Sequence, residues 1–234
     1  LVPHVIGSML DHLPDDDPLH NFAGSGEEII QRMIAEGYTG RKGKGGFYRL
    51  NKEGGKRVKE ARNLKTGEYA PAERKAGFPS AKMGKQGLGQ LMDYPDEGAA
   101  FVQDVLLDTL SYAASIVPEV SDDIYSIDGA MRVGYNWKRG PFEMIDSIGV
   151  ENFAKRLESS GRKTPPLVNK AASMGSFYSF EDGELMRMTP DGSKSAVPRP
   201  EETISISDFK RKGSPIIRNP SASIWDMGDD ILLV

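Results

Sequence analysis

The stretch AMRVGYNWKRGPFEMID, residues 130–146, decides how the rest of the chain is interpreted. Its first residues complete a helical pattern, and Gly134 is suited to end that helix because glycine tolerates a left-handed backbone. Gly140 and Pro141 then restart the chain, since proline is favoured at the first position of a new helix. Apolar residues after Pro141 recur at helical spacing. The stretch therefore predicts two helices joined by a compact aromatic corner at residues 135–137.

This corner resembles the signature of the C-terminal helical domain of 3-hydroxyacyl-CoA dehydrogenases. In that family a helix ending in A-M-R/K-x-G runs into an aromatic residue and then into G-P-F-E-x-I/L-D. Eleven residues fit this signature in order and spacing: Ala130, Met131, Arg132, Gly134, Trp137, Gly140, Pro141, Phe142, Glu143, Ile145 and Asp146. The resemblance implies a mainly α fold of this helical-domain type, partly duplicated, with short β-hairpins and long loops. In the family the motif is architectural and is not the catalytic centre.

Composition excludes several classes of protein. The 234 residues carry a formal net charge of -4, which argues against general nucleic-acid binding because phosphates need a basic surface. The chain has no cysteine, so disulfides and thiolate metal sites are excluded. No apolar run approaches the roughly 20 residues that span a bilayer, and no signal peptide is recognisable. We expect a cytoplasmic protein.

The helical pattern is strongest at residues 96–116. Seven apolar residues there form a wide stripe that predicts a central, mostly buried helix: Phe101, Val102, Val105, Leu106, Leu110, Ala113 and Ala114. Ser25, with Glu28 three residues later, is predicted to cap a shorter helix. The chain begins inside an apolar helical pattern and ends in the run ILLV, residues 231–234, which has no predicted strand partner. We therefore expect it to be part of a longer polypeptide.

A basic, glycine-rich segment covers residues 40–48. Its glycines permit close backbone approach, and Arg41, Lys42 and Lys44 form a candidate anion site for the phosphates of coenzyme A. The alternative is a flexible basic loop that enters a strand. The segment also resembles, with one displacement, the G-R-K-x-G-K-G-F-Y segment that follows the corner in the same family. Because it precedes the corner here, the resemblance implies an earlier copy of the helical domain.

The layout predicts an internal repeat. The letters G-x-F-Y at residues 175–178 echo G-F-Y at residues 46–48, and each follows a short helix. The resemblance then divides the chain as follows: the tail of a first helical domain at 1–50, a linker and hairpin region at 51–94, a complete second helical domain at 95–180, and a hairpin end, linker and start of a following domain at 181–234. Residues 223–234 resemble the first strand of an enoyl-CoA hydratase domain.

No catalytic, cofactor-binding or metal-binding residue is assigned in this chain. In the family, NAD and a His–Glu pair belong to a Rossmann domain, and no G-x-G-x-x-G follows a strand here. The glycines of residues 84–89 have no strand before them, and His4, His12 and His20 lie outside any family motif. The acid run at residues 15–17 suggests a metal site, but consecutive residues in a loop point in different directions, so a solvated loop is favoured. NAD is expected with the full-length enzyme and not with this piece.

The family's helical domain supplies one active-site residue, an Asn in the run F-I-V-N-R-L-L. The corresponding run here is AFVQDVL, residues 100–106, so Gln103 stands where that Asn would be and Asp104 replaces the Arg. Gln is one methylene longer, and about 1 Å matters at a positioned site. The second copy is therefore expected to have lost the catalytic role and to act as a structural partner of the first.

Three functions follow as hypotheses. The first is the helical portion of a multifunctional β-oxidation enzyme, inactive alone, with an acyl-CoA substrate and with Rossmann and hydratase domains in the same chain. The second is a non-catalytic helical interaction or dimerisation module, with a homodimer as one form. The third is acyl-CoA binding by this piece through Arg41, Lys42 and Lys44.

Overall fold

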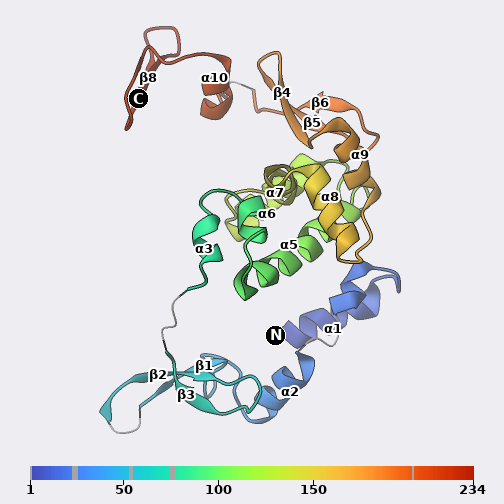
Figure 1. Cartoon of the computed structure of the whole chain (residues 1–234), viewed down its shortest axis with the longest axis vertical. Helices are drawn as coiled ribbons and strands as arrows, with labels where there is room; N and C mark the ends of the chain where they lie inside the picture. Colours follow the sequence, from blue (N-terminus) through green and yellow to red (C-terminus); the bar gives the residue numbers. More distant parts are fainter. Residues whose placement is uncertain (1, 23–25, 53–54, 74–76, 202) are drawn as a thin grey trace. The chain divides into compact units, whose positions relative to one another are not determined.

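The computed structural model describes residues 2–22, 26–52, 55–73, 77–201 and 203–234. The chain divides into two compact units, Leu1–Gly77 and Phe78–Val234, which Figure 1 colours from blue to cyan and from green to red. The chain is mainly α-helical, and the sheets within the described residues are small, three-stranded and antiparallel. Within those residues, no helix combines the length and the apolar character needed to cross a membrane.

Unit 1 is two helices followed by a sheet. Its elements are α1 (Val2–His12), a 3-10 turn (Pro18–Phe22), α2 (Glu27–Ala35), β1 (Tyr48–Asn51), β2 (Val58–Arg62) and β3 (Tyr69–Pro71). Helix α2 starts directly after Gly26, whose φ of 73° favours glycine. The proposed cap Ser25 lies outside the described residues. β1 and β2 form an antiparallel hairpin, with Tyr48 opposite Ala61.

Unit 2 is a helical bundle with two small sheets after it. The helices are α3 (Ser80–Met83), α4 (Leu88–Met92), α5 (Glu97–Ser115), α6 (Ile124–Tyr135), α7 (Pro141–Ile148), α8 (Val150–Ser159) and α9 (Pro166–Met174). The rest comprises β4 (Tyr178–Glu181), β5 (Glu184–Met188), β6 (Lys194–Ala196), α10 (Ile206–Lys212), β7 (Ile217–Arg218), β8 (Ser223–Asp226) and β9 (Leu232–Leu233). Asp96 caps α5 by accepting a hydrogen bond of 2.8 Å from Ala99 N.

The core of unit 2 lies where α7, α8 and α9 pack on one side of α5 (Figure 1). Its fully buried side chains include Leu107, Leu110, Phe142, Ile145 and Phe153. The prediction of a mostly buried helix fails at the start of α5, where Phe101 is 70% exposed and Val105 is 45% exposed. The bundle covers one face of α5, and these two residues lie on the other.

Three local predictions were also wrong. Helix α6 does not stop at Gly134; it continues to Tyr135, and Asn136 adopts the left-handed conformation, with φ 55°, that ends it. Asparagine tolerates this conformation better than most residues. Tyr135 is exposed, so residues 135–137 do not form a compact aromatic corner. The terminal run does have a strand partner, since β9 pairs with β8 through a turn containing Asp229 and Asp230.

The sheets β1–β2–β3 and β4–β5–β6 have the same construction. Their strands contain four, five and three residues in the same order, with Tyr48 paired to Ala61 in one and Tyr178 paired to Arg187 in the other. The same backbone bond closes both, from Arg62 N to Phe47 O and from Met188 N to Phe177 O, each 2.8 Å. A nine-residue helix precedes each sheet. Twelve residues, 36–47, join helix to sheet in unit 1, whereas three, 175–177, do so in unit 2.

Candidate functional site

A buried carboxylate organises the corner of unit 2. Asp128 on α6 is fully buried and accepts hydrogen bonds from Phe142 N at 2.9 Å and from Glu143 N at 3.3 Å. These two N–H groups belong to the first turn of α7 and have no partner within that helix. A negative charge at a helix N-terminus is also electrostatically favourable. Asp128 therefore caps α7 from the neighbouring helix.

The residues at the start of α7 explain why this corner has its sequence. A Cβ on Gly140 would lie 2.3 Å from the Asp128 side chain, so glycine is required there for close approach. Pro141 has no N–H and so needs no acceptor. The Glu143 carboxylate accepts from Gly140 N at 2.8 Å and pairs with Arg132 at 2.7 Å. Each residue of the Gly-Pro-Phe-Glu run thus has a structural task.

A second carboxylate joins the corner to the sheet. Asp146 accepts hydrogen bonds from Phe177 N at 2.7 Å and from Tyr178 N at 2.9 Å, at the start of β4. The Tyr178 hydroxyl donates to Asp128 at 2.8 Å. The Phe177 ring packs edge-on against Phe142, with ring centroids 4.9 Å apart. The two carboxylates therefore hold α6, α7 and β4 together.

The electrostatics of this corner follow from burial. Burial raises the pKa of Asp128 to about 6, against the hydrogen bonds from Phe142 N and Tyr178, which favour the charged form. Burial likewise raises the pKa of Asp146 to about 6. The pKa of Tyr178 is raised by burial and by the charge of Asp128. Raised carboxyl pKa values also occur at catalytic sites, but here both groups are engaged by backbone donors, so their role is structural.

Sequence reasoning missed Asp128. The available signal was an acid on a helical face that also carries Ile124, Ile127 and Met131, where an apolar residue would ordinarily stand. The pattern alone does not predict which buried N–H or O–H groups would donate hydrogen bonds to an acid at that position.

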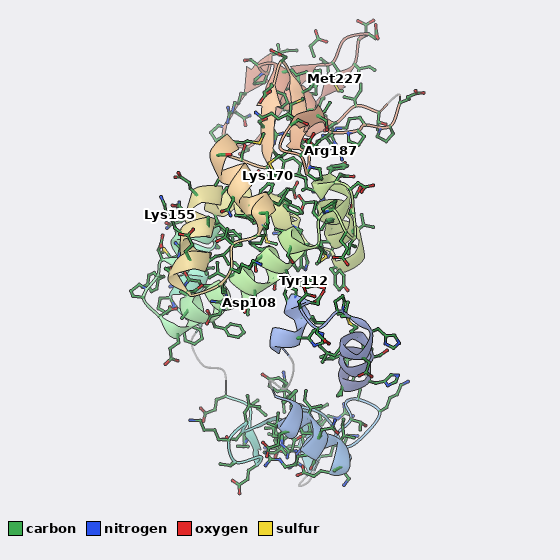
Figure 2. All side chains as sticks on the ribbon, turned by 90° about the vertical axis from the view of Figure 1, so that its right-hand side faces the viewer. Asp108, Tyr112, Lys155, Lys170, Arg187 and Met227 are labelled. Carbon is green, nitrogen blue, oxygen red and sulfur yellow. The ribbon has the colours of Figure 1, made fainter. Side chains whose placement is uncertain are left out.

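Gln103, on α5, is tied to α8. Its amide oxygen accepts a hydrogen bond of 2.6 Å from Arg156 Nη1, and the same guanidinium pairs with Asp93. Five residues beyond Gln103, Asp108 pairs with Arg162 at 2.6 Å. The polar side of α5 is therefore bonded to α8 and to the segment that follows it. Figure 2 labels Asp108 on α5 and Lys155 on α8.

A surface pocket of about 420 Å³ lies beside this contact. Five residues line it: Asp93, Asn152, Lys155, Arg156 and Ser159. All five are polar, which does not suit the apolar chain of a fatty acyl group. The Arg156 guanidinium is already bonded to Gln103 and Asp93. The pocket is therefore a polar surface hollow beside the Gln103–Arg156 contact and is not a channel for an acyl chain.

The structure does not gather the three cations of the glycine-rich loop around one point. Gly40 N donates to Gly45 O at 2.7 Å, so the segment forms a closed turn with Arg41 and Lys42 exposed. The Lys44 ammonium instead donates to Glu36 O at 3.0 Å, at the C-terminal end of α2. A cation there stabilises the helix end. Lys44 thus has a structural contact that Arg41 and Lys42 do not share.

Beneath this loop lies a cluster of charged and aromatic side chains. The Arg62 side chain is 2% exposed and pairs with Glu36 at 2.6 Å. Its guanidinium lies 5.3 Å from the ring centroid of Tyr38 and 5.4 Å from that of Tyr69. Arg49 pairs with Glu60 at 2.6 Å and donates to the Tyr38 hydroxyl at 3.1 Å. Sequence reasoning did not identify this cluster.

Two further sequence-based candidates are placed by the structure. His12 Nδ1 lies 2.7 Å from Ser8 O on α1, and in the described part of the chain no three His, Asp or Glu side chains gather as a metal site. Gly84 and Gly87 lie in the turn between α3 and α4, and Gly89 lies within α4. Neither that turn nor the antiparallel sheets suit a dinucleotide, which binds at the carboxyl ends of parallel strands.

Comparison with known proteins identifies relatives. A probable 3-hydroxyacyl-CoA dehydrogenase of Bacillus subtilis (strain 168) is 32% identical over 216 residues, which covers 88% of this chain and 26% of that protein. A putative fatty acid oxidation complex trifunctional enzyme of Rickettsia felis is 33% identical over 163 residues, covering 70% of this chain and 22% of that protein. Over most of its length the chain is similar in sequence to a part of 3-hydroxyacyl-CoA dehydrogenases and fatty acid oxidation trifunctional enzymes.

The chain spans about a quarter of the length of these 3-hydroxyacyl-CoA dehydrogenase relatives. No protein-family model and no solved structure gives a significant match. The α6–α7 corner carries the motif that resembles the 3-hydroxyacyl-CoA dehydrogenases. In this corner Asp128 accepts a hydrogen bond from Phe142 N, and Asp146 accepts one from Phe177 N.

Proposed function

We propose that this chain is a structural part of a 3-hydroxyacyl-CoA dehydrogenase of fatty-acid β-oxidation, and that the NAD-linked oxidation of 3-hydroxyacyl-CoA takes place on residues outside it. The observation that carries the proposal is the bond between Gln103 and Arg156. In this proposal residues 95–180 are a complete helical domain of the family's C-terminal type, and residues 1–50 are the tail of an earlier copy. Residues 51–94 and 181–234 link them to each other and to a following hydratase domain, in a cytoplasmic enzyme.

The position of Gln103 supports a structural role. A residue that orients a substrate needs a free amide, and the Gln103 oxygen accepts a charge-assisted bond. Releasing it would cost about 1.5–3 kcal/mol, because the bond involves a charged donor. Asp93 holds the other side of the Arg156 guanidinium, so the arginine is itself fixed. This arrangement connects two helices and commits the Gln103 oxygen to a contact within the chain.

The test is an NAD-linked assay with acetoacetyl-CoA on this chain and on a longer polypeptide that contains it. We expect turnover by the longer polypeptide alone. Within that polypeptide, Gln103→Ala should change kcat by less than about twofold, since a residue outside the reaction contributes no transition-state binding. Turnover by the 234 residues, or a large fall in kcat with KM unchanged for Gln103→Ala, would overturn the proposal. Glu151→Ala, on the exposed face of α8, is the matched control.

A second candidate, a dimerisation module, is favoured by one observation. Phe101 and Val105 lie one turn apart on α5 and are both exposed, which gives the helix an apolar stripe on its outer face. A second copy of the chain is the proposed partner. Sedimentation equilibrium should then show a dimer that Phe101→Ser with Val105→Ser dissociates. A monomer at every concentration tested would reject this function.

In the third candidate function, coenzyme A binding, the set of candidate phosphate-binding side chains is reduced from three cations to two. Arg41 and Lys42 are exposed on the closed turn, whereas Lys44 bonds to the end of α2. We propose them as phosphate contacts for an acyl-CoA. Calorimetry with coenzyme A should give saturable heat that Arg41→Ala with Lys42→Ala removes. Heat no greater than that of dilution into buffer would eliminate this function.

A further inference from the structure

The two Phe-Tyr pairs that open the repeated sheets differ in exposure. Phe177 is 1% exposed, and Tyr178 is partly buried. Phe47 is 44% exposed and Tyr48 is 60% exposed, although Tyr48 holds the same register position in its sheet. The backbone is therefore the same in both places, and the difference lies in what covers it.

In unit 2 the α6–α7 corner covers the pair through three contacts. The Asp146 carboxylate accepts from the N–H groups of Phe177 and Tyr178. The Phe142 ring packs on the Phe177 ring. Asp128 accepts from the Tyr178 hydroxyl. Together these contacts provide acceptors for two backbone N–H groups and one hydroxyl, and they cover one aromatic ring.

Unit 1 presents the same four groups without such a cover. Among the described residues, neither Phe47 N nor Tyr48 N donates a hydrogen bond, and Phe47 and Tyr48 are exposed. The surroundings are basic, because residues 41–65 contain ten Lys or Arg and two Glu. One of these cations, Lys59, places its ammonium 4.5 Å from the Tyr48 ring centroid. Such a surface suits an occupant that brings carboxylates and an aromatic ring.

We infer that Phe47 and Tyr48 form a docking site for a helix of the α7 type, supplied by polypeptide outside residues 1–234. The helix has Phe as its second residue and Asp as its sixth, as α7 has Phe142 and Asp146. Its Asp accepts from Phe47 N and Tyr48 N, and its Phe packs on the Phe47 ring. An acid on the preceding helix accepts from the Tyr48 hydroxyl. The inference rests on the repeated sheet and stands whether or not the chain takes part in hydride transfer.

The test uses the whole chain with a second copy of residues 119–149 attached ahead of residue 1 by a flexible linker. Tethering raises the effective concentration of the added corner to about the millimolar range. We expect hydrogen exchange to be fast at Phe47 and Tyr48 in the untethered chain, and slow at Phe177 and Tyr178, whose N–H groups are bonded to Asp146 and serve as the internal reference. We expect the added corner to slow exchange at Phe47 and Tyr48 roughly tenfold.

Two variants decide whether the effect is specific. Asp146→Ala placed in the added copy alone should abolish the protection, because it removes the acceptor for both N–H groups. Phe47→Ser should weaken it, whereas Phe101→Ser, at an exposed aromatic position in unit 2, should not. Unchanged exchange at Phe47 and Tyr48, or equal protection from the Asp146→Ala copy, would overturn the inference.

Discussion

Arg62 and Met188 occupy the same position in two sheets of identical register, yet their surroundings are opposite in character. Met188 packs into the apolar core of unit 2. Arg62 is buried among Tyr38, Tyr69 and Glu36. In the described part of unit 1, Met33 is the one hydrophobic residue that is buried.

The difference shows that the same sheet architecture can pack against an apolar core or against a cluster of charged and aromatic side chains. In unit 2 the removal of apolar surface from water contributes about 25 cal/mol per Å² and is not weakened by charge screening. In unit 1 the stabilising contacts are ion pairs and cation–π contacts, each worth about 0.5–2 kcal/mol. Partly exposed pairs are also screened by salt. The two units should therefore respond differently to the same perturbations.

The largest expected effect is in the apolar core. Phe142→Ala removes a fully buried ring that packs on Phe177, so unit 2 should lose about 3–5 kcal/mol of unfolding free energy. Urea denaturation followed by tryptophan fluorescence reports on this unit, because Trp137 and Trp225 both belong to it. Phe101→Ala, at an exposed position, is the matched control and should change the free energy by less than about 0.5 kcal/mol. Equal losses would mean that the core is not where we place it.

Lowering the pH should change the stability of the two units in opposite directions. The folded-state pKa of about 6 for Asp128 and Asp146 exceeds the ordinary value, so the folded state binds more protons between about pH 4 and 6. Unit 2 should therefore gain stability as pH falls from 7 to 5, by about 1.3 kcal/mol per carboxyl group. In unit 1, hydrogen bonds from Asn51 and Arg49 lower the pKa of Glu60. The contribution of Glu60 to folding stability is therefore fully present above the ordinary pKa of a glutamate and is lost as the pH falls through the lowered pKa.

Denaturation curves at pH 7, 6 and 5 measure the gain in unit 2, and curves below about pH 4.5 measure the loss in unit 1. Asp128→Asn should flatten part of the pH dependence of unit 2 while leaving unit 1 unchanged. A loss of unit 2 stability over this range would show that the hydrogen bonds to the charged carboxylates outweigh the cost of burying them.

The next effect lies in the charged cluster of unit 1. Tyr38→Leu removes the ring beside Arg62 and the hydroxyl that accepts from Arg49, and should cost unit 1 about 1–2 kcal/mol. Tyr38→Phe keeps the ring and should cost about half as much. Hydrogen exchange at β1 and β2 measures the change. If the two variants cost the same, the ring contributes nothing.

The smallest effect is expected on the surface of α8. Lys155 and Glu151 form an exposed pair one turn apart, 3.6 Å between Lys155 Nζ and Glu151 Oε2. Lys155→Ala should change the unfolding free energy of unit 2 by less than about 0.5 kcal/mol. A larger loss in urea denaturation would indicate that the neighbouring pocket contributes to stability.

Local signals in the sequence were sufficient for part of this structure. Pro141 and the apolar spacing after it predicted α7, which starts at that residue. The burial of Arg62 could not be predicted, because Lys59, Glu60 and Arg62 in one strand indicate a solvated face. Its partners, Tyr38 and Glu36, come from a segment more than 20 residues earlier. Burial of a charge depends on such distant partners, which periodicity does not report.

The same limit applies to the candidate site. The position of Gln103 follows from a short motif, but its bond to Arg156 spans 53 residues of sequence. The exposure of Phe101 was missed because an apolar stripe predicts burial without saying how many neighbours the fold provides. Contacts between elements, more than the elements themselves, are what the sequence pattern left undetermined.

The cap that Asp128 provides to α7 makes the two helices mutually dependent during folding. Without α7, a buried acid on α6 has lost its backbone donors; without α6, the first turn of α7 has lost its acceptor. Asp128 and Phe142 are 14 residues apart, so the loop between them closes at low entropic cost and the pair can form early. The loop between α6 and α7 is therefore a poor site for new termini, whether by circular permutation or by splitting the protein into complementing halves.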